Sequence, residues 1–378
     1  MKKMLMLASV ASMIDQFNIP NIEILKKQGY EVHVACNFEK GSTCSAERIN
    51  ELKKLLSKMN VPFFQIDFSR NVLKLNEVLK AYQQVKKLCM QERYDFLHCH
   101  SPIGGVIGRL AGHATNTKVI YTAHGFHFFK GAPLINWLIY YPIEKWLARY
   151  TDVLITINKE DYERVKKFNA KKVEYIPGVG VNLDNFKPAN AQRNKLRDEF
   201  GIQKNNIVLL SVGELIKRKN HKIIIQALEK LQNPNVIYCI CGQGPLKGEL
   251  ELLAKDCHVE KQVRFMGFRK DIANMCAMSD IFVFPSLQEG LSMALMEAMA
   301  CGLPIVCSDI RGNDELIATE KSGYRVPVSD IEGYVKNIDS ICKNEKLRKE
   351  CGEYNRSYVK QFGIDKVNEK MKTIYKYL

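Results

Sequence analysis

Short apolar runs alternate with amphipathic stretches along nearly the whole chain. The apolar runs are rich in Val, Ile and Leu, and their length suits strands that are buried on both faces of a sheet. The amphipathic stretches repeat their apolar positions with the period of a helix. Strands that alternate with helices in this way predict an α/β protein built on parallel sheets.

The first half of the chain contains enough alternating elements for one doubly wound domain. Strands are expected at residues 4–10, 31–36, 62–67, 95–100, 118–124, 152–157 and 172–177. Helices are expected at residues 21–28, 46–59 and 75–92, after Pro102, and at residues 134–149.

A second series of the same kind follows residues 178–188, whose turn formers and lack of periodicity predict a hinge. Its strands are expected at residues 207–213, 236–242, 263–268, 281–286, 304–309 and 324–327, with helices between them and at 193–200, 329–342, 346–361 and 365–377. We therefore predict an α/β fold of two Rossmann-like, doubly wound domains that face each other across a cleft. The domains are residues 1–180 and 190–360, with a closing helix at 364–378 that packs back on the first.

The composition is that of a globular protein, with 46% hydrophobic and 26% charged residues. No apolar stretch reaches the roughly 18 residues that a membrane-spanning helix needs, so the chain is expected to touch a bilayer at most. The formal net charge is +15, and residues 1–180 hold 26 basic and 16 acidic side chains against 30 and 25 in residues 181–378. Such a surface suits an anionic membrane or a phosphate-bearing ligand, or it is simply solvated.

The N-terminal residues and the twelve cysteines bear on the compartment. Two lysines and a short apolar run imitate a secretory signal, but the run continues into a helix-like segment and a second strand, so we interpret it as the first strand of a domain. The cysteines are scattered and contain no Cys-x-x-Cys pair. We expect reduced thiols, a cytoplasmic protein and no structural zinc.

The residues that suggest chemistry come directly after strands, where parallel sheets bind their ligands. In FVFPSLQEGLSMALMEAMACGLPIVCSD, Glu289 lies in a loop and Glu297 eight positions later, on a helix expected to begin near Leu291. Two carboxylates at this separation suit two hydroxyl groups of one extended ligand, and the helix start between them suits a diphosphate. The alternative is that both glutamates are solvated surface residues.

This stretch, with its continuation IRGNDELI, resembles the signature of glycosyltransferase family 4, in which two glutamates flank seven residues. The resemblance extends over almost the whole chain and points to the GT-B fold and to the exopolysaccharide and capsule branch. It implies that Glu289 acts at the donor sugar and that Glu297 binds the nucleotide ribose. Further donor contacts are implied at Pro285, Ser286, Gly290, Leu291 and Ser292.

A second match, VGELIKRKN, begins at Val212, after the first strand of the second domain. Family members usually place an arginine and a lysine here on the donor diphosphate, next to a glycine that corresponds to Gly213. Lys219 takes the lysine position, whereas Glu214 stands where arginine is usual, so Arg218 or Lys217 would supply the missing charge. A fixed cation stabilises the charge that a leaving diphosphate gains in the transition state.

Two glycine turns complete the donor side. CGQGP contains Gly242 and Gly244, resembles the Gly-x-Gly-Pro loop of the family and would let the backbone approach a ligand closely. MGFRKD contains Gly267 and Phe268 and resembles the segment whose backbone reads the base.

In the first domain, four of the eight histidines lie at two strand ends, in HCHSP and TAHGFHF. Their spacing is not that of metal ligands, so we expect no metal and no cofactor apart from the nucleotide-sugar substrate. The resemblance implies that His124 is the active-site histidine at the donor sugar. His127 is an acceptor-side candidate, and His98 and His100 are expected to be packed or acceptor-side residues.

Two further segments of the first domain bear on the acceptor. SVASMIDQFNIP lacks the glycine-rich loop that is common in the family but resembles its polysaccharide branch, with Phe17, Asn18 and Pro20 at the acceptor site. The aromatic segment 134–150 is expected to form a buried helix. The alternative is a helix that dips into a membrane interface, with Lys145 and Arg149 beside anionic lipid.

Together these features predict a retaining glycosyltransferase, peripheral at the inner face of the cell membrane. It would move a hexosyl or N-acetylhexosaminyl group from a UDP-sugar, of the UDP-GlcNAc type, to a lipid-linked saccharide in surface polysaccharide assembly. The first domain would bind the acceptor and the second the donor. Nucleic acid is not an expected partner, because the aromatic residues are not interleaved with the basic ones. The alternatives are a nucleotide-sugar epimerase of the same fold and a basic polyanion-binding protein.

Overall fold

The computed structural model describes residues 2–41, 44–69, 74–187 and 190–378. The chain divides into two compact units: Met1–Val179 with Lys366–Leu378, and Gly180–Asp365. The segment expected to be a hinge starts at this division, and its last residue, Pro188, lies outside the described residues.

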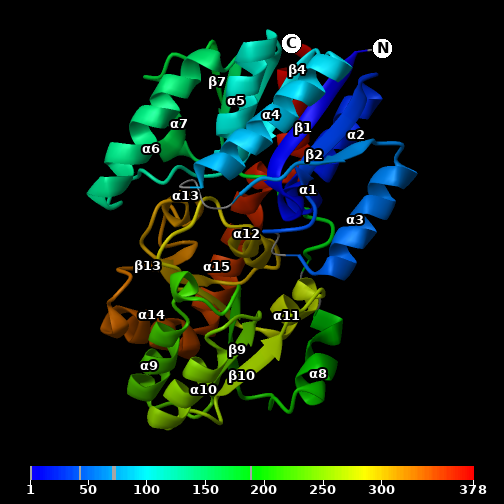
Figure 1. The fold of residues 1–378 in the computed structure, drawn as a ribbon. Coiled ribbons are helices and arrows are strands. Elements are labelled where there is room, and N and C mark those ends of the chain that lie inside the picture. Colours follow the sequence, from blue (N-terminus) through cyan, green and yellow to red (C-terminus); the bar gives the residue numbers. More distant parts are fainter. Residues whose placement is uncertain (1, 42–43, 70–73, 188–189) are drawn as a thin grey trace. The chain divides into compact units, whose positions relative to one another are not determined.

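In the described part of the first unit, a seven-stranded parallel sheet has the order β3-β2-β1-β4-β5-β6-β7 (Figure 1). Its strands are β1 (Lys3–Val10), β2 (Glu31–Asn37), β3 (Phe63–Gln65), β4 (Phe96–His100), β5 (Lys118–Ala123), β6 (Val153–Thr156) and β7 (Lys172–Tyr175). The strand order reverses between β1 and β4, which is where open α/β sheets place a ligand site.

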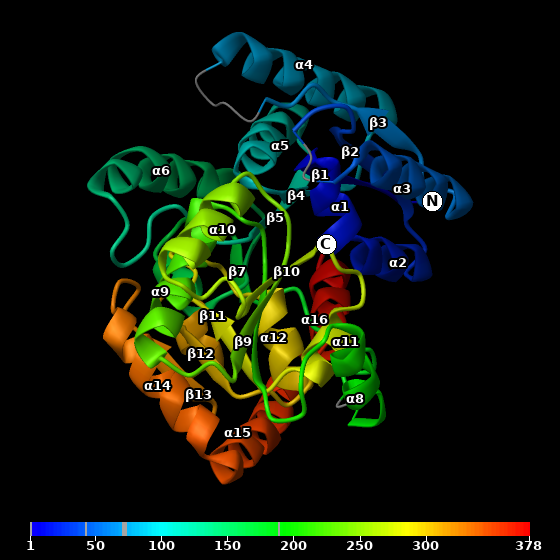
Figure 2. The ribbon, with the colours of Figure 1, turned by 90° about the horizontal axis from the view of Figure 1, so that it is seen from below.

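Helices cover both faces of this sheet because the strands are apolar on both sides. One face is covered by α1 (Ala11–Phe17), α2 (Ile19–Lys27), α3 (Ala46–Lys58) and α16 (Ile364–Lys376). The other face is covered by α4 (Leu75–Glu92), α5 (Pro102–Thr115), α6 (Leu134–Leu147) and α7 (Lys159–Val165). Figure 2 shows α16, in red, beside α1 and α2, so the last helix of the chain completes the core of the first unit.

The described part of the second unit is built on a six-stranded parallel sheet in the order β10-β9-β8-β11-β12-β13. Its strands are β8 (Ile207–Val212), β9 (Val236–Cys241), β10 (Val263–Gly267), β11 (Ile281–Phe284), β12 (Ile305–Ser308) and β13 (Gly323–Val326). Here the order reverses between β8 and β11.

The helices of the second unit again lie on both faces. One face packs against α8 (Asn190–Glu199), α11 (Ile272–Met278), α12 (Met293–Ala300) and the 3-10 helix η3 (Val359–Phe362). The other packs against α9 (Lys222–Leu231), α10 (Lys247–Asp256) and α14 (Ile331–Lys343). The remaining helices are η2 (Lys217–Lys219), α13 (Asn313–Leu316) and α15 (Glu345–Tyr358).

Each expected strand has its counterpart in the structure, which confirms the α/β class and the two parallel sheets. The apolar pattern did not predict α1, α7 and α13. These helices have seven, seven and four residues, too few for a helical period to repeat clearly. Among the described helices, none is both long and apolar enough to cross a bilayer.

Candidate functional site

The loops that follow β8 and β11 meet at Glu289. Lys219 Nζ lies 2.8 Å and Arg218 Nη1 2.7 Å from the same oxygen, Glu289 Oε1. The backbone also joins the two loops, because Leu287 N–H donates to the Arg218 carbonyl at 2.8 Å. Because β8 and β11 are neighbours where the strand order reverses, residues 70 positions apart come together at the carboxyl ends of the sheet.

Local packing holds Lys219 in place. Its Nζ lies 4.8 Å from the centre of the Phe284 ring, and its aliphatic stem lies against Gly213, where an added Cβ would come within 3.0 Å of Lys219 Cε. The short helix η2 ends at Asn220, whose φ of +52° turns the chain sharply into α9. Only 13% of the Lys219 side chain is exposed, so its charge is pre-positioned at the site.

Of the two candidates for the second cation, Arg218 lies at the site. Its guanidinium also donates to the Gln288 carbonyl at 3.0 Å. Lys217 instead lines an apolar pocket with Leu250 and Leu253, and Glu214 is exposed to solvent. The arrangement therefore places two cations on one carboxylate, a charge set that would accept an anionic ligand.

Glu297 lies on α12, beyond a capped helix start. Ser292 is the N-cap, and its hydroxyl accepts from Leu295 N–H at 3.4 Å, so the helix begins at Met293. Glu297 forms no ion pair within the described residues, and burial raises the pKa of its carboxyl to about 7. A ligand that donates hydrogen bonds to this buried carboxyl would stabilise its ionised form.

The remaining residues near the helix start are largely covered. Ser286 is fully buried, and its hydroxyl has no partner among the described residues. Pro285, Leu291 and Ser292 are buried, whereas Gly290 is partly exposed. The structure thus brings these predicted donor residues together, with Gly290 and Glu289 at the accessible edge.

The glycines of the second unit are required by loops that approach one another. A Cβ on Gly242 would lie 1.8 Å from the carbonyl oxygen of Gly213, and one on Gly244 would lie 2.5 Å from that of Leu215. These contacts show that the CGQGP glycines allow two loops to pack together, a cause that the sequence analysis did not foresee. Gly267 has φ +67° at the end of β10, and the side chain of Phe268 beside it is 66% exposed.

The segment after β12 that supports the Glu289 loop was not predicted from the sequence. A Cβ on Gly312 would lie 1.6 Å from the Gly290 carbonyl oxygen, and Gly312 has φ +85°. Asn313 anchors this segment by donating to the Ser308 carbonyl at 3.0 Å. The available signal was the Gly-Asn pair that follows β12, at the same edge of the sheet.

In the first unit, His124 follows β5 and lies beside Phe17. The ring centres of these two residues are 5.6 Å apart, and both line a small cavity of about 20 Å³ with Pro20 and Thr122. Burial lowers the pKa of His124 to about 4, so its imidazole is neutral near pH 7. Its Nε2 lies 3.0 Å from Nδ1 of His100, a partner that the sequence pattern did not indicate.

The other acceptor-side candidates have different surroundings. Asn18 is fully buried; its amide donates to the Met13 carbonyl at 3.0 Å and accepts from Asn21, so it joins α1 to α2. Pro20 lies in the first turn of α2. His127 does not line the cavity that His124 lines. Its ring stacks on Tyr140, with ring centres 4.7 Å apart.

The expectation that residues 134–149 form a buried helix is wrong. Of α6, only Glu144 and Leu147 are buried, whereas Leu134 and Leu138 are 80% and 73% exposed. The sequence could not decide this, because the inner and outer faces of the helix are both apolar or aromatic. The exposed large apolar residues of α6 are Leu134, Ile135, Leu138, Ile139, Ile143 and Trp146.

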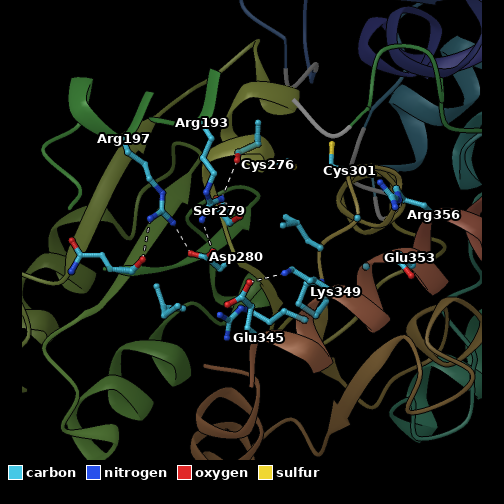
Figure 3. A pocket seen from close by; sticks show the side chains of 18 of the residues that line it. Arg193, Arg197, Cys276, Ser279, Asp280, Cys301, Glu345, Lys349, Glu353 and Arg356 are labelled. Atoms are coloured by element: carbon cyan, nitrogen blue, oxygen red, sulfur yellow. Dashed lines mark hydrogen bonds and ion pairs between the residues drawn. The ribbon is translucent and has the colours of Figure 1, made fainter. Parts of the chain in front are cut away.

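A separate pocket of about 470 Å³ lies at the amino ends of β8, β11 and β12 (Figure 3). Two of its arginines serve the structure: Arg193 and Arg197 both bind the Asp280 carboxylate and also donate to backbone carbonyls. They anchor α8 to the sheet at the end opposite to Glu289. Among the described residues, no group of three or more His, Cys, Asp or Glu side chains is placed to hold a metal ion.

Two family models match the chain. The model described as "Glycosyl transferases group 1" matches residues 192–358, and the model described as "Glycosyltransferase Family 4" matches residues 22–185. The two matches together cover most of both units.

The chain is also similar to curated proteins over nearly its full length. It is 35% identical to the putative glycosyltransferase EpsD of Bacillus subtilis, over 99% of this chain and 96% of that protein. It is 28% identical to the UDP-Gal:alpha-D-GlcNAc-diphosphoundecaprenol alpha-1,3-galactosyltransferase of Escherichia coli, over 98% of this chain and 95% of that protein.

Solved structures share the fold. Anabaena HepE, crystallised in complex with UDP, has a TM-score of 0.79 and 20% identity over the whole of both chains. Sucrose-phosphate synthase from Thermosynechococcus elongatus has a TM-score of 0.80 and 18% identity over 100% of this chain and 99% of the other. This likeness confirms the GT-B fold, which has two Rossmann-like domains.

Proposed function

Because the chain belongs to the family-4 glycosyltransferases, we propose that it transfers a sugar from a UDP-linked donor to a lipid-linked saccharide with retention of configuration. The enzyme would act without a catalytic metal, at the inner face of a membrane, in the assembly of a surface polysaccharide such as a capsule. The observation that carries this proposal is the convergence of Lys219 and Arg218 on Glu289.

In this proposal the ion pairs at Glu289 are the resting state of the donor site. The donor diphosphate takes the place of the Glu289 carboxylate as the partner of Lys219 and Arg218. Glu289 is then free to accept hydrogen bonds from hydroxyl groups of the donor sugar. Cations held in place before the reaction stabilise the charge of the leaving diphosphate, an effect that can lower the barrier by several kcal/mol.

Glu297 and His124 complete the assignment. The Glu297 carboxylate accepts from the ribose hydroxyls, which offsets the cost of its burial. His124 acts at the donor sugar as a neutral hydrogen-bonding group. The bond from the anomeric carbon to the diphosphate breaks as the acceptor oxygen bonds on the same face, and a diphosphate oxygen receives the acceptor proton.

The relatives support the choice of substrates. The Escherichia coli relative is named for a UDP-galactose donor and a GlcNAc-diphosphoundecaprenol acceptor. A Campylobacter jejuni relative, 29% identical over 67% of this chain and 65% of that protein, is also named for an undecaprenol-linked acceptor. HepE, the structural neighbour, was crystallised with UDP-glucose as well as with UDP. We infer a UDP-hexose or UDP-N-acetylhexosamine donor, with UDP-GlcNAc as the type expected.

The outer face of α6 supports an anionic membrane as the place of the reaction. At 3.6 residues per turn, its six exposed apolar side chains fall within about half of the helix circumference. Within residues 134–150 the exposed charges are the cations Lys145 and Arg149, because the single acid of the segment, Glu144, is buried. An apolar face bordered by cations and a tryptophan suits a bilayer interface that contains anionic lipid.

The transfer is tested with purified protein, a panel of UDP-sugars and a saccharide linked to polyprenyl diphosphate. We expect one donor to be used and NMR of the product to show the anomeric configuration of the donor. Lys219→Ala should lower turnover by about two orders of magnitude, as loss of one charge-stabilising donor does in other sites, whereas Lys217→Ala should not. A product with inverted configuration would exclude the proposal. Conversion of the UDP-sugar into its epimer in the absence of an acceptor would exclude it as well.

Membrane binding is tested by sedimentation with liposomes. The double variant Leu134→Ser/Leu138→Ser should bind phosphatidylglycerol vesicles much more weakly than the wild type. The matched control is Leu75→Ser, whose side chain is 74% exposed on α4 of the same unit. Equal binding by all three proteins would remove α6 from the proposal, and a dimer that the double variant abolishes would show that α6 binds a second copy instead.

A further inference from the structure

Three histidine rings lie in a row at the carboxyl ends of β4 and β5. His100 Nδ1 is 3.0 Å from His124 Nε2, and the ring centres of His98 and His100 are 4.1 Å apart. His98 hydrogen bonds to the hydroxyl of Tyr375 on α16 and to the hydroxyl of Thr122, both at 2.8 Å. The proposed reaction uses His124 alone, so His98 and His100 form a buried layer behind it.

The contact with His100 leaves one nitrogen of His124 available. Nε2 of His124 faces His100, while Nδ1 makes no hydrogen bond to any described residue. His124 and His100 both line the small cavity beside Phe17, but His100 is only 1% exposed, and its Nε2 has no hydrogen-bond partner among the described residues. A ligand can therefore meet His124 at Nδ1, whereas the burial of His100 leaves its ring almost no surface for direct contact, so its hydrogen bond to His124 is its main route of action.

Burial makes both rings neutral near pH 7. It lowers the pKa of His100 well below the ordinary value and that of His124 to about 4. A neutral imidazole has one N–H donor and one bare acceptor nitrogen. The hydrogen bond between the two rings needs one of each, so the proton position on His100 decides which nitrogen of His124 carries the proton.

The backbone next to His100 is strained. Ser101 has φ +67° and ψ 156°, a conformation found almost only for glycine, which costs on the order of 1–3 kcal/mol. Its hydroxyl accepts from Ser9 N–H at 3.2 Å, which ties the end of β4 to the end of β1. Strain of this kind persists where the surroundings dictate a position, and here it fixes the backbone at the residue directly after His100.

We propose that His100 is the positioning residue of His124: through the Nδ1···Nε2 hydrogen bond it holds the His124 ring in one orientation and one tautomer and presents Nδ1 to the donor sugar. The contact itself is a property of the free protein, whereas its effect on turnover rests on the proposed transferase function. The two parts can therefore fail separately.

The first test reads the tautomer directly. In protein labelled with ¹⁵N-histidine, two-bond ¹H–¹⁵N spectra of the free enzyme distinguish Nδ1–H from Nε2–H, and His124→Gln assigns the His124 signals. We expect a single neutral tautomer for His124 in the wild type and an averaged mixture in His100→Ala. His100→Asn, whose amide lies near the place of Nδ1, should restore one tautomer. The matched control is His113→Ala, which removes an exposed histidine stacked on Tyr150.

The second test is kinetic. His100→Ala should lower kcat about tenfold or more with a smaller change in KM for the donor, and His100→Asn should recover most of the loss. Thermal unfolding of each variant separates this effect from loss of the fold. An averaged His124 tautomer in the wild type, or an unchanged one in His100→Ala, overturns the proposal. A wild-type enzyme that shows the tautomer but transfers no sugar instead counts against the transferase function.

Discussion

Arg109 and Glu144 form an ion pair inside the first unit, with Nη1 and Oε2 2.8 Å apart and side chains 0% and 9% exposed. The pair joins α5 to α6. The guanidinium also lies 4.1 Å from the centre of the Tyr121 ring and donates to the Gly105 carbonyl. The helix whose outer face is apolar is thus attached by a charged contact on its inner face.

Removing one member of this pair should be costly. Glu144→Gln leaves the Arg109 charge buried without its partner and should lower the free energy of unfolding by about 3–5 kcal/mol. Denaturant unfolding measures the change. The control is Glu163→Gln, which breaks a solvent-exposed pair with Lys166 and should change the free energy of unfolding far less. A similar, small effect of both substitutions would mean that α6 is attached by other contacts.

Arg218, rather than Lys217, should contribute to nucleotide binding. Arg218→Ala removes one charged hydrogen-bond donor from the diphosphate and should weaken UDP binding by roughly tenfold or more. Lys217→Ala should leave the Kd nearly unchanged, because that side chain lines a different pocket. Isothermal titration calorimetry at fixed salt measures both. A stronger effect at Lys217 would reverse the assignment.

Glu289→Gln should separate binding from chemistry. In the resting site the carboxylate competes with the diphosphate for Lys219 and Arg218. The neutral amide removes that competition, so we expect UDP without sugar to bind more tightly, by a few-fold, while sugar transfer is lost. The same titration and the transfer assay give the two results. Weaker UDP binding in this variant would argue against the proposal that the diphosphate replaces the Glu289 carboxylate as the partner of the two cations.

Glu297 should make stability depend on pH. Its pKa is about 7 in the folded chain, against about 4.3 in an unfolded one, so the folded state binds the extra proton between these values. The free energy of unfolding therefore falls as pH rises from about 4.5 to 7, by roughly 2–3 kcal/mol from this group. Glu297→Gln should remove that part of the slope in urea titrations without ligand. If the free energy of unfolding of the variant changed with pH just as that of the wild type does, the raised pKa of the Glu297 carboxyl would be contradicted.

Gly242→Ala should disturb the donor site through the backbone. The new Cβ would lie 1.8 Å from the Gly213 carbonyl, so the loops after β8 and β9 must separate. We expect a loss of stability of about 1–3 kcal/mol and weaker UDP binding. Gly248→Ala, on α10 with nothing within 4 Å of the added Cβ, is the matched control and should be neutral or slightly stabilising. Equal stability of the two variants would mean that the loops adjust freely.

The order of elements and much of the second unit's site were determined by the sequence itself. Strand positions follow from runs such as Val236–Cys241, where local apolar pattern and β-branched residues coincide. Glu289 and Lys219 were predictable because each lies in the loop after a strand, and Glu297 because it lies eight positions after Glu289 in the same recognisable motif. These are local signals, and local signals are readable along a chain.

Only the tertiary structure decided which residues meet. In the folded chain Arg218, and not Lys217, contacts Glu289, and the close approach of Gly312 to Gly290 appears only where their loops cross. The partner of His124 lies 24 residues away, on a neighbouring strand. The exposed face of α6 was misjudged because burial depends on what packs against a helix. Contacts between distant segments carry no periodic signature, so only the folded chain reveals them.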